Sequence, residues 1–375
     1  MIYRAIWPGI YAEYAWIIET QLTALTVYTV SHTMVLYFIL HKMKYETHRL
    51  VSRSLRRKKG GFLMSTQNIQ AIRVNQYGGP EQLELEQIPR PVPQEGEVLV
   101  RVYAAGVNPI DWKIRSGVLK DYYPVPLPHT PGRDIAGIIE EVGPGVTAFQ
   151  VGQAVFGQTS LGAYAEYTTA PINKLALKPA SLSFDEAAAI PVGATTAWQG
   201  LFDHGNLQPG QHILIQGAAG GVGTFAVQFA RWKGAHVIGT ASAANVDFVH
   251  ALGAETVVDY TTTAVENAVH NVDLVLDTVG GKTLESSLQA VKRGGTLVTI
   301  AGQPSQEKAQ ERNIHIASFS AQVSSELLST FARLIEEGQL KVAVAAQFSL
   351  RDAHKAHEMS QGGHGRGRIV LHIAG

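Results

Sequence analysis

The sequence predicts an α/β protein in which a small, partly open β-barrel precedes a doubly wound parallel sheet. Between residues 64 and 185, short β-type runs alternate with Gly- and Pro-rich turns, which is typical of a barrel. From 186 to 320, apolar strands alternate with helical segments, which is typical of a parallel sheet covered by helices. Residues 321–375 are predicted to return the chain to the first domain.

The β-type runs of the first domain are short and are separated by turn signals such as Gly143-Pro144-Gly145. Between two of them lies an extended loop at 124–128, where each proline restricts the residue before it to β or polyproline geometry. The predicted strands are 69–74, 98–107, 135–142, 154–156 and 163–169.

The second domain is predicted from its alternation of apolar strands and helices. Its strands are expected at 212–215, 236–240, 256–260, 273–277, 296–301 and 314–319. Its helices are expected at 222–233, 246–252 and 283–291. An amphipathic helix at 327–337 follows, and the last strand, 368–373, is expected to pair with the first domain.

Composition indicates a folded protein without thiol chemistry. Of the 375 residues, 45% are hydrophobic and 17% are charged, which excludes a largely disordered chain. There is no cysteine, so neither a disulfide framework nor a thiolate metal site can form. The absence of cysteine fits a reducing compartment, and we expect a cytoplasmic location.

The charge is unevenly distributed along the chain. Residues 1–63 carry nine Lys or Arg against three acids, whereas residues 64–375 carry 22 against 28. The mildly acidic body gives a nucleic-acid partner no electrostatic support, so none is expected.

Residues 1–63 allow two interpretations. The stretch 16–40 is mostly apolar and just long enough to span a bilayer, and the basic residues of 42–59 would form its cytoplasmic flank. However, residues 59–63 can be encoded by a purine-rich tract that resembles a bacterial ribosome-binding site just before Met64. We therefore favour a mis-set start codon, with a membrane anchor as the alternative.

A glycine-rich turn between the expected strand 212–215 and the expected helix 222–233 predicts a nucleotide site. Glycines there let a backbone approach a pyrophosphate, and the helix N-terminus supplies free N–H groups and a positive dipole end. The strand–turn–helix context favours this interpretation over a plain tight turn. The expected contacts are Gly217, Ala218, Ala219, Gly220, Gly221, Val222 and Gly223.

Six separated motifs then occur in a recognisable order, at 96–102, 105–111, 131–137, 152–157, 218–223 and 366–371. In this order they resemble the medium-chain dehydrogenase/reductase superfamily, specifically its zinc-free quinone oxidoreductase branch. The resemblance covers nearly all of residues 66–375. It implies a GroES-like domain at 64–185, a Rossmann domain at 186–320, and a homodimer.

Two departures from the zinc-dependent members exclude their chemistry. Those members carry a catalytic cysteine where Asn108 stands, and Gly-His-Glu where Gly132, Arg133 and Asp134 stand. Catalytic zinc in such a site needs thiolate and imidazole ligands, which neither asparagine nor arginine can replace. No metal is therefore expected.

The cofactor is predicted to be NADPH. In this fold an acid at the end of the second strand binds the ribose 2′-OH of NAD, but 239–244 contains no acid. Ser242 can instead donate to a 2′-phosphate, and Tyr260 matches a tyrosine that the family uses nearby. Asp247 is interpreted as a helix-start acid, which the dipole favours. By motif, the remaining cofactor contacts are Thr196, Val279, Gly280, Ala301 and Arg366, the last of which is equally well explained as an ordinary exposed arginine.

The chemistry expected is metal-free hydride transfer to a quinone or an α,β-unsaturated carbonyl. Asn108 is the candidate for orienting the substrate or the nicotinamide. Asp111 is a catalytic candidate, although capping of 112–115 is the favoured role. Tyr123 is a further catalytic candidate: with Tyr122 it is expected to line the substrate cleft, where either tyrosine is a candidate proton donor, or else to pack within its loop. Alternatives are a zinc-free alcohol or aldehyde reductase, and a cofactor-binding protein with a structural or RNA-binding role.

Overall fold

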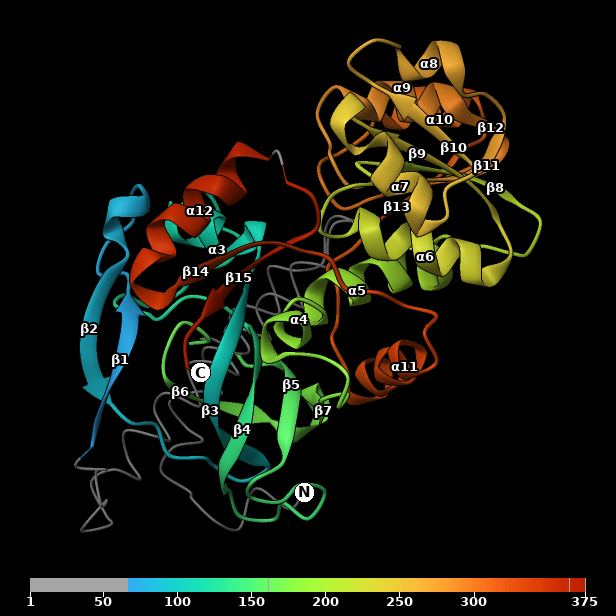
Figure 1. Ribbon diagram of the computed structural model, residues 1–375. Helices are drawn as coiled ribbons and strands as arrows, with labels where there is room; N and C mark the ends of the chain where they lie inside the picture. Colours follow the sequence, from blue (N-terminus) through green and yellow to red (C-terminus); the bar gives the residue numbers. More distant parts are fainter. Residues whose placement is uncertain (1–66, 161, 364, 375) are drawn as a thin grey trace, which may run out of the picture. The chain divides into compact units, whose positions relative to one another are not determined.

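The computed structural model describes residues 67–160, 162–363 and 365–374 (Figure 1). All of them belong to one compact unit, Ser65–Gly375. The predictions for residues 1–63, including the start at Met64 and the membrane segment 16–40, fall outside the described residues. Within the described ranges, no helix is both long and apolar enough to cross a bilayer.

A six-stranded parallel sheet forms the second half of the unit, as the strand–helix alternation predicts. Its strands follow the order β10-β9-β8-β11-β12-β13, and every neighbouring pair is parallel. The chain order reverses between β8 and β11, which is the topological switch point where such sheets bind ligands. The strands are β8 (His212–Gln216), β9 (His236–Ala241), β10 (Thr256–Asp259), β11 (Val272–Asp277), β12 (Val291–Thr299) and β13 (His315–Ser318).

Short helices connect these strands, and α6, α7 and α9 lie where the sequence predicts helices. Helix α6 (Gly223–Lys233) buries Phe225, Val227 and Phe229 and ends at Gly234, whose φ of 85° is the left-handed conformation that favours glycine. The other helices of this half are α7 (Val246–Leu252), α8 (Val265–Ala268), α9 (Thr283–Ala290) and α10 (Gln306–Glu311). Helix α7 has the predicted bounds.

A seven-stranded sheet forms the first half, together with a separate antiparallel pair, β1 (Asn68–Arg73) and β2 (Glu84–Pro89). Six strands run in the order β14-β15-β3-β4-β5-β7, and β6 pairs with β3. The C-terminal strand β15 pairs antiparallel with β3, which brings the end of the chain back to this sheet. The strands are β3 (Glu97–Val107), β4 (Asp134–Val142), β5 (Ala154–Gln158), β6 (Tyr167–Pro171), β7 (Leu175–Leu177), β14 (Val344–Ser349) and β15 (Arg368–His372).

Helices α4 (Phe184–Ala188) and α5 (Pro191–Trp198) lie between the two sheets (Figure 1). One buried cluster includes Phe156 of the first sheet, Ile190 between the helices and Ile215 of the second sheet, so the two sheets share a core. Three more helices complete the fold, namely α3 (Pro109–Arg115), α11 (Ser325–Glu336) and α12 (Ala353–Gly362). The exact domain boundaries at 185/186 and 320/321 stay predictions.

Two predicted strands differ from the structure by more than two residues at one end. The strand expected at 163–169 begins only at Tyr167, because the N–H groups of Ala163 and Tyr164 donate to the carbonyls of Gly132 and Pro131 instead of to a neighbouring strand. The strand expected at 296–301 begins at Val291, directly after α9. Both shifts depend on partners far away in the sequence.

Candidate active site

The glycine-rich turn is held tightly between β8 and α6. Gly217, with φ of 72°, donates its N–H to Thr240 Oγ1 at 3.0 Å, and Ala218 donates to the Thr240 carbonyl at 3.0 Å. A Cβ added to Gly223 would lie 2.1 Å from the Gly217 carbonyl oxygen. The turn therefore needs glycine at its two ends, one for its backbone conformation and one for its close packing.

Three N–H groups of the turn, those of Ala219, Gly221 and Val222, donate no hydrogen bond to any described residue. They lie at the start of α6, where the helix dipole favours negative charge. These residues therefore fit the pyrophosphate of a dinucleotide.

The loops after β11 and β12 join this turn. A Cβ added to Gly217 would lie 2.9 Å from Val279 Cγ2, and one added to Gly280 would lie 1.7 Å from the Ala301 carbonyl oxygen. Asp277 holds the first loop, because its Oδ1 accepts the N–H groups of Val279 and Gly280 at 2.9 and 2.8 Å. Three predicted cofactor positions thus lie beside the turn at the switch point.

A second polar group forms at the end of β9. Arg366 Nε donates to Asn245 Oδ1 at 3.2 Å, and Asn245 Nδ2 donates to Ser242 Oγ at 3.2 Å. The N–H of Tyr260 donates to the carbonyl of Ala241, directly before Ser242. The structure therefore brings Ser242, Tyr260 and Arg366 to one strand end. Asn245 was not predicted as a site residue, because the residues around it are typical only of the start of a helix.

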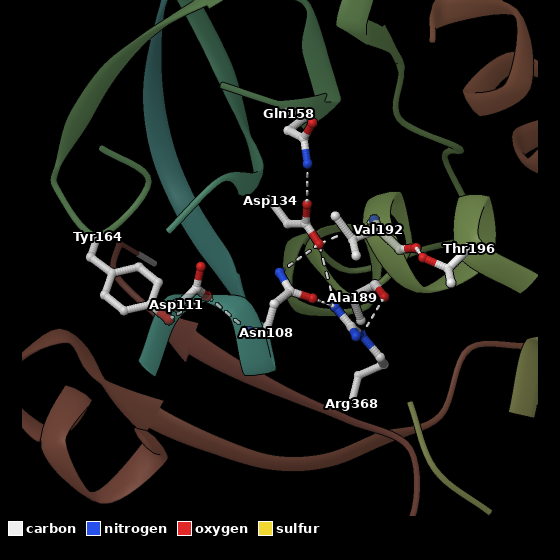
Figure 2. A network of polar contacts seen from close by, with 9 residues as sticks. All are labelled: Asn108, Asp111, Asp134, Gln158, Tyr164, Ala189, Val192, Thr196 and Arg368. Atoms are coloured by element: carbon white, nitrogen blue, oxygen red, sulfur yellow. Dashed lines mark hydrogen bonds and ion pairs between the residues drawn. The ribbon is translucent and has the colours of Figure 1, made fainter. Parts of the chain in front are cut away.

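A buried polar network lies between the two sheets and is drawn in Figure 2. Asp134 Oδ2 accepts Asn108 Nδ2 at 3.0 Å, Val192 N–H at 3.2 Å and Arg368 Nη2 at 3.3 Å. Gln158 Nε2 approaches Asp134 Oδ1 at 3.4 Å. Burial raises the pKa of Asp134, and the positive charge of Arg368 is the largest influence opposing that rise.

Arg368 connects this network to the glycine turn. Its Nη2 donates to Asn108 Oδ1 at 2.6 Å and its Nε to the Ala189 carbonyl at 3.0 Å. A Cβ added to Gly221 would lie 2.9 Å from Arg368 Cδ, so the arginine packs directly against the turn. From the sequence, Arg368 was predicted to begin the last strand within the motif at 366–371, with no role at the site. The signal that could have indicated its role is the charge itself, because Arg368 begins an otherwise apolar strand.

Asn108 uses its side chain inside this network. Its Nδ2 donates to Asp134 and its Oδ1 accepts from Arg368, and the residue is buried. These contacts make it a bridge between Asp134 and Arg368. Thr196 lies beside the network, because its hydroxyl donates to the carbonyl of Val192 at 2.7 Å and the N–H of Val192 donates to Asp134 (Figure 2).

Asp111 does not cap 112–115 as predicted, because α3 begins at Pro109 with Asn108 as its N-cap and Asp111 is the third helical residue. Its Oδ2 accepts the N–H of Asn108 at 2.8 Å and the hydroxyl of Tyr164 at 3.0 Å. The Tyr164 hydroxyl also lies 3.2 Å from Nε2 of His357, a buried residue of α12. Burial, together with the charge of Asp134, raises the pKa of Asp111 to about 7. No sequence spacing indicated Tyr164 or His357.

The two loop tyrosines differ in exposure. Tyr122 is 81% exposed, whereas Tyr123 is 39% exposed and lies over the guanidinium of Arg133 at 4.9 Å from the ring centroid. Tyr123 is therefore tied to the residue directly before Asp134, and Tyr122 faces solvent.

Comparison with known proteins supports the same arrangement. The family model described as Alcohol dehydrogenase GroES-like domain matches residues 94–180, and the model described as Zinc-binding dehydrogenase matches residues 252–371. The quinone oxidoreductase of Mus musculus is 35% identical over 326 residues, which cover 81% of this chain and 97% of that protein. The chain belongs to the medium-chain dehydrogenase/reductase superfamily. Within it, the chain falls in the quinone oxidoreductase-like branch.

Two further similarities inform the chemistry. The 2-methylene-furan-3-one reductase of Solanum lycopersicum is 32% identical over 310 residues, covering 79% of this chain and 77% of that protein. A mycobacterial protein solved in complex with NADPH superposes with a TM-score of 0.74 and 30% identity, covering 81% of this chain and 99% of that one.

The residues at the position of the superfamily's catalytic zinc do not fit a zinc ion. The side chain of Asn108 is occupied by Asp134 and Arg368, and Arg133 supplies a cation where a ligand would be needed. In the described part of the chain, no three His, Cys, Asp or Glu residues are arranged to hold a metal ion.

The raised pKa of Asp111 predicts a pH-dependent effect of Asp111→Asn on stability. Between pH 3.8 and about 7, the folded protein keeps a proton on Asp111 that the unfolded chain has lost. The contribution of this group to stability therefore falls as the pH rises through that window. Asparagine does not titrate, so the variant should gain stability relative to the wild type as the pH rises through this window, by up to about 4 kcal/mol.

Urea unfolding of both proteins at several pH values checks this. Both hydrogen bonds of Asp111 end on one oxygen, Oδ2, so an asparagine carbonyl oxygen at that position can accept them both. Asp203→Asn, at an exposed position, is the control and should show a constant difference from the wild type. A constant difference for Asp111→Asn as well would contradict the prediction.

Proposed function

We propose that this chain is an NADPH-dependent, zinc-independent reductase that transfers hydride to a quinone or an α,β-unsaturated carbonyl. The observation that carries the proposal is the buried network of Asn108, Asp134 and Arg368. By motif resemblance, two of its members, Asn108 and Asp134, stand where zinc-dependent members carry Cys and Glu, and Arg368 packs against the dinucleotide turn. A site without a Lewis acid to stabilise an alkoxide suits the reduction of a conjugated carbonyl better than the oxidation of an alcohol.

Different parts of the site bind the cofactor and position it relative to the substrate. The turn from Gly217 to Gly223 binds the pyrophosphate through its free N–H groups, and the loops at Val279 and Ala301 flank it. A bound nicotinamide supplies the hydride. The network around Asn108 fixes the junction between the two sheets, and this positions the turn relative to the substrate residues.

NADPH is favoured over NADH by the group at the end of β9. Arg366, Asn245 and Ser242 form a chain of hydrogen bonds there, and residues 239–244 contain no acid to repel a phosphate. Arginine and hydroxyl donors are well suited to a 2′-phosphate. The NADPH complex of the mycobacterial relative supports the same choice.

Oxidation of NADPH by the full chain, measured with panels of quinones, enones and simple aldehydes, tests the function. Turnover with quinones or enones that continues in the presence of EDTA is expected. Turnover confined to aldehydes would favour the alcohol/aldehyde reductase alternative, and activity abolished by EDTA would contradict the metal-free chemistry. The homodimer stays a prediction, which light scattering of the same preparation checks.

Arg366→Gln should weaken NADPH binding roughly tenfold and leave NADH binding nearly unchanged, because only the phosphate needs the guanidinium. Ser242→Asp should go further and reverse the preference, since a carboxylate repels the phosphate and accepts the ribose hydroxyl. Fluorescence titration of each reduced cofactor measures both changes. Arg351→Gln, at another exposed arginine, is the control. Equal losses for the two cofactors in Arg366→Gln would contradict the assignment.

A further inference from the structure

Arg133 lies directly beside the buried network and plays no part in its hydrogen bonds. It precedes Asp134, the first residue of β4, and its own carbonyl accepts the N–H of Thr159 at 2.8 Å. Through Asp134 and Arg368, the backbone at Arg133 is connected to Gly221 of the dinucleotide turn. The side chain of Arg133 is partly buried. A fixed backbone next to the proposed cofactor site makes this side chain a candidate for substrate contact.

The charge of Arg133 has no direct counter-ion in the described part of the chain. No carboxylate there lies within ion-pair distance of it, and its Nε is buried without a hydrogen-bond partner. Burial lowers the pKa of Arg133, and the more distant charges of Asp111 and Asp134 oppose that shift. A guanidinium keeps its charge under all ordinary conditions. The ring of Tyr123, 4.9 Å away, holds the group by a cation–π contact.

We propose that the Arg133 guanidinium donates hydrogen bonds to the substrate carbonyl oxygen and stabilises the negative charge that develops there. The inference rests on the proposed function. When a reduced nicotinamide dinucleotide gives its hydride to a conjugated carbonyl compound, the carbonyl π electrons move onto oxygen. A proton from solvent then completes the hydroquinone, or the saturated ketone after tautomerisation. Arg133 thereby does electrostatically what a zinc ion does in metal-dependent members.

A binding experiment without cofactor tests this role separately from activity. The probe is para-nitrophenol, whose absorbance reports whether it binds as the phenolate, and para-nitroanisole is its neutral counterpart. The wild type should bind the phenolate more tightly than the neutral compound. Arg133→Gln should lose about tenfold in phenolate affinity, the size expected for a charge-assisted hydrogen bond, with no change for the anisole. Arg133→Lys should recover part of the loss.

Kinetics with the full chain then give a second readout. Arg133→Gln should lower kcat with a quinone by roughly 100-fold while KM for NADPH stays unchanged, as expected for loss of one oxyanion donor. Arg101→Gln is the matched control, because Arg101 also stacks on a tyrosine, Tyr103, but lies on an exposed part of β3. Tyr123→Leu removes the ring and leaves Arg133 in place, so it should show a smaller loss of the same kind.

The outcomes separate the two proposals. Equal phenolate affinity in the wild type and Arg133→Gln would overturn the role of Arg133, whatever the enzyme reduces. Selective phenolate loss in a protein that reduces no quinone or enone would overturn the proposed function and leave Arg133 as an oxyanion donor of a different reaction. Loss of affinity for both probes in Arg133→Gln would indicate a disturbed fold. In that case Arg133→Lys and Tyr123→Leu decide: if neither variant binds the phenolate more tightly than the anisole, the proposal is overturned.

Discussion

Replacing Arg368 by leucine is expected to lower the free energy of unfolding by about 3–5 kcal/mol. Asp134 and Arg368 are both almost fully buried, and the substitution leaves the carboxylate without its positive partner. It also removes the donors to the Asn108 side chain and to the Ala189 carbonyl. A buried charge and two buried acceptors thus lose their partners at the junction of the two sheets.

Urea unfolding followed by circular dichroism measures this loss. Arg333→Gln is the control, because Arg333 pairs with Glu337 on the exposed face of α11 and its loss should cost about 0.5 kcal/mol or less. The double variant Arg368→Leu with Asp134→Asn should recover part of the stability, since it removes the unpaired charge. A loss for Arg368→Leu no larger than that of the control would show that the network does not hold the junction.

The second large effect is expected at the dinucleotide turn. Gly223→Val should reduce dinucleotide affinity by more than about 100-fold, since misplacement by 1 Å at such a site can have an effect of that size. The added Cβ would lie 2.1 Å from the Gly217 carbonyl oxygen and 2.7 Å from Ala218 Cα. Both are backbone atoms, so the turn has to open and its free N–H groups have to move.

Cofactor fluorescence titration measures the affinity of this variant, and thermal unfolding without cofactor shows whether the fold survives. Gly210→Ala is a useful control. Its φ is 78°, but a Cβ there meets nothing within 4 Å, so it introduces backbone strain without the clash. Normal cofactor binding by Gly223→Val would rule out this turn as the pyrophosphate site.

Local sequence patterns were sufficient to predict most of the parallel sheet. The apolar strands at 212–215 and 273–277 and the helix 246–252 depend on interactions within each segment and on burial, which a single sequence displays. The cap of α3 was predicted wrongly: Asn108 is the N-cap, and Asp111, expected to cap 112–115, instead accepts the N-cap N–H from the third helical position.

The polar site required the tertiary structure. Arg368 lies 260 positions from Asn108 and 234 from Asp134, and no local pattern indicates that their side chains meet. The same holds for Tyr164 and His357, which are 193 positions apart. Such contacts are decided by the return of β15 to β3 and by the packing of α12, which place distant residues together only after the sheets form.

Sequence patterns were enough to place a glycine-rich turn among alternating strands and helices, and to put Asn108, Arg133 and Asp134 where zinc-dependent members carry other residues. The folded chain added the partner of Asn108 and Asp134, which is Arg368 from the last strand. The physical reason is the range of the interactions. Backbone conformation and burial patterns act over a few residues, whereas buried charges need partners that only a completed fold can supply.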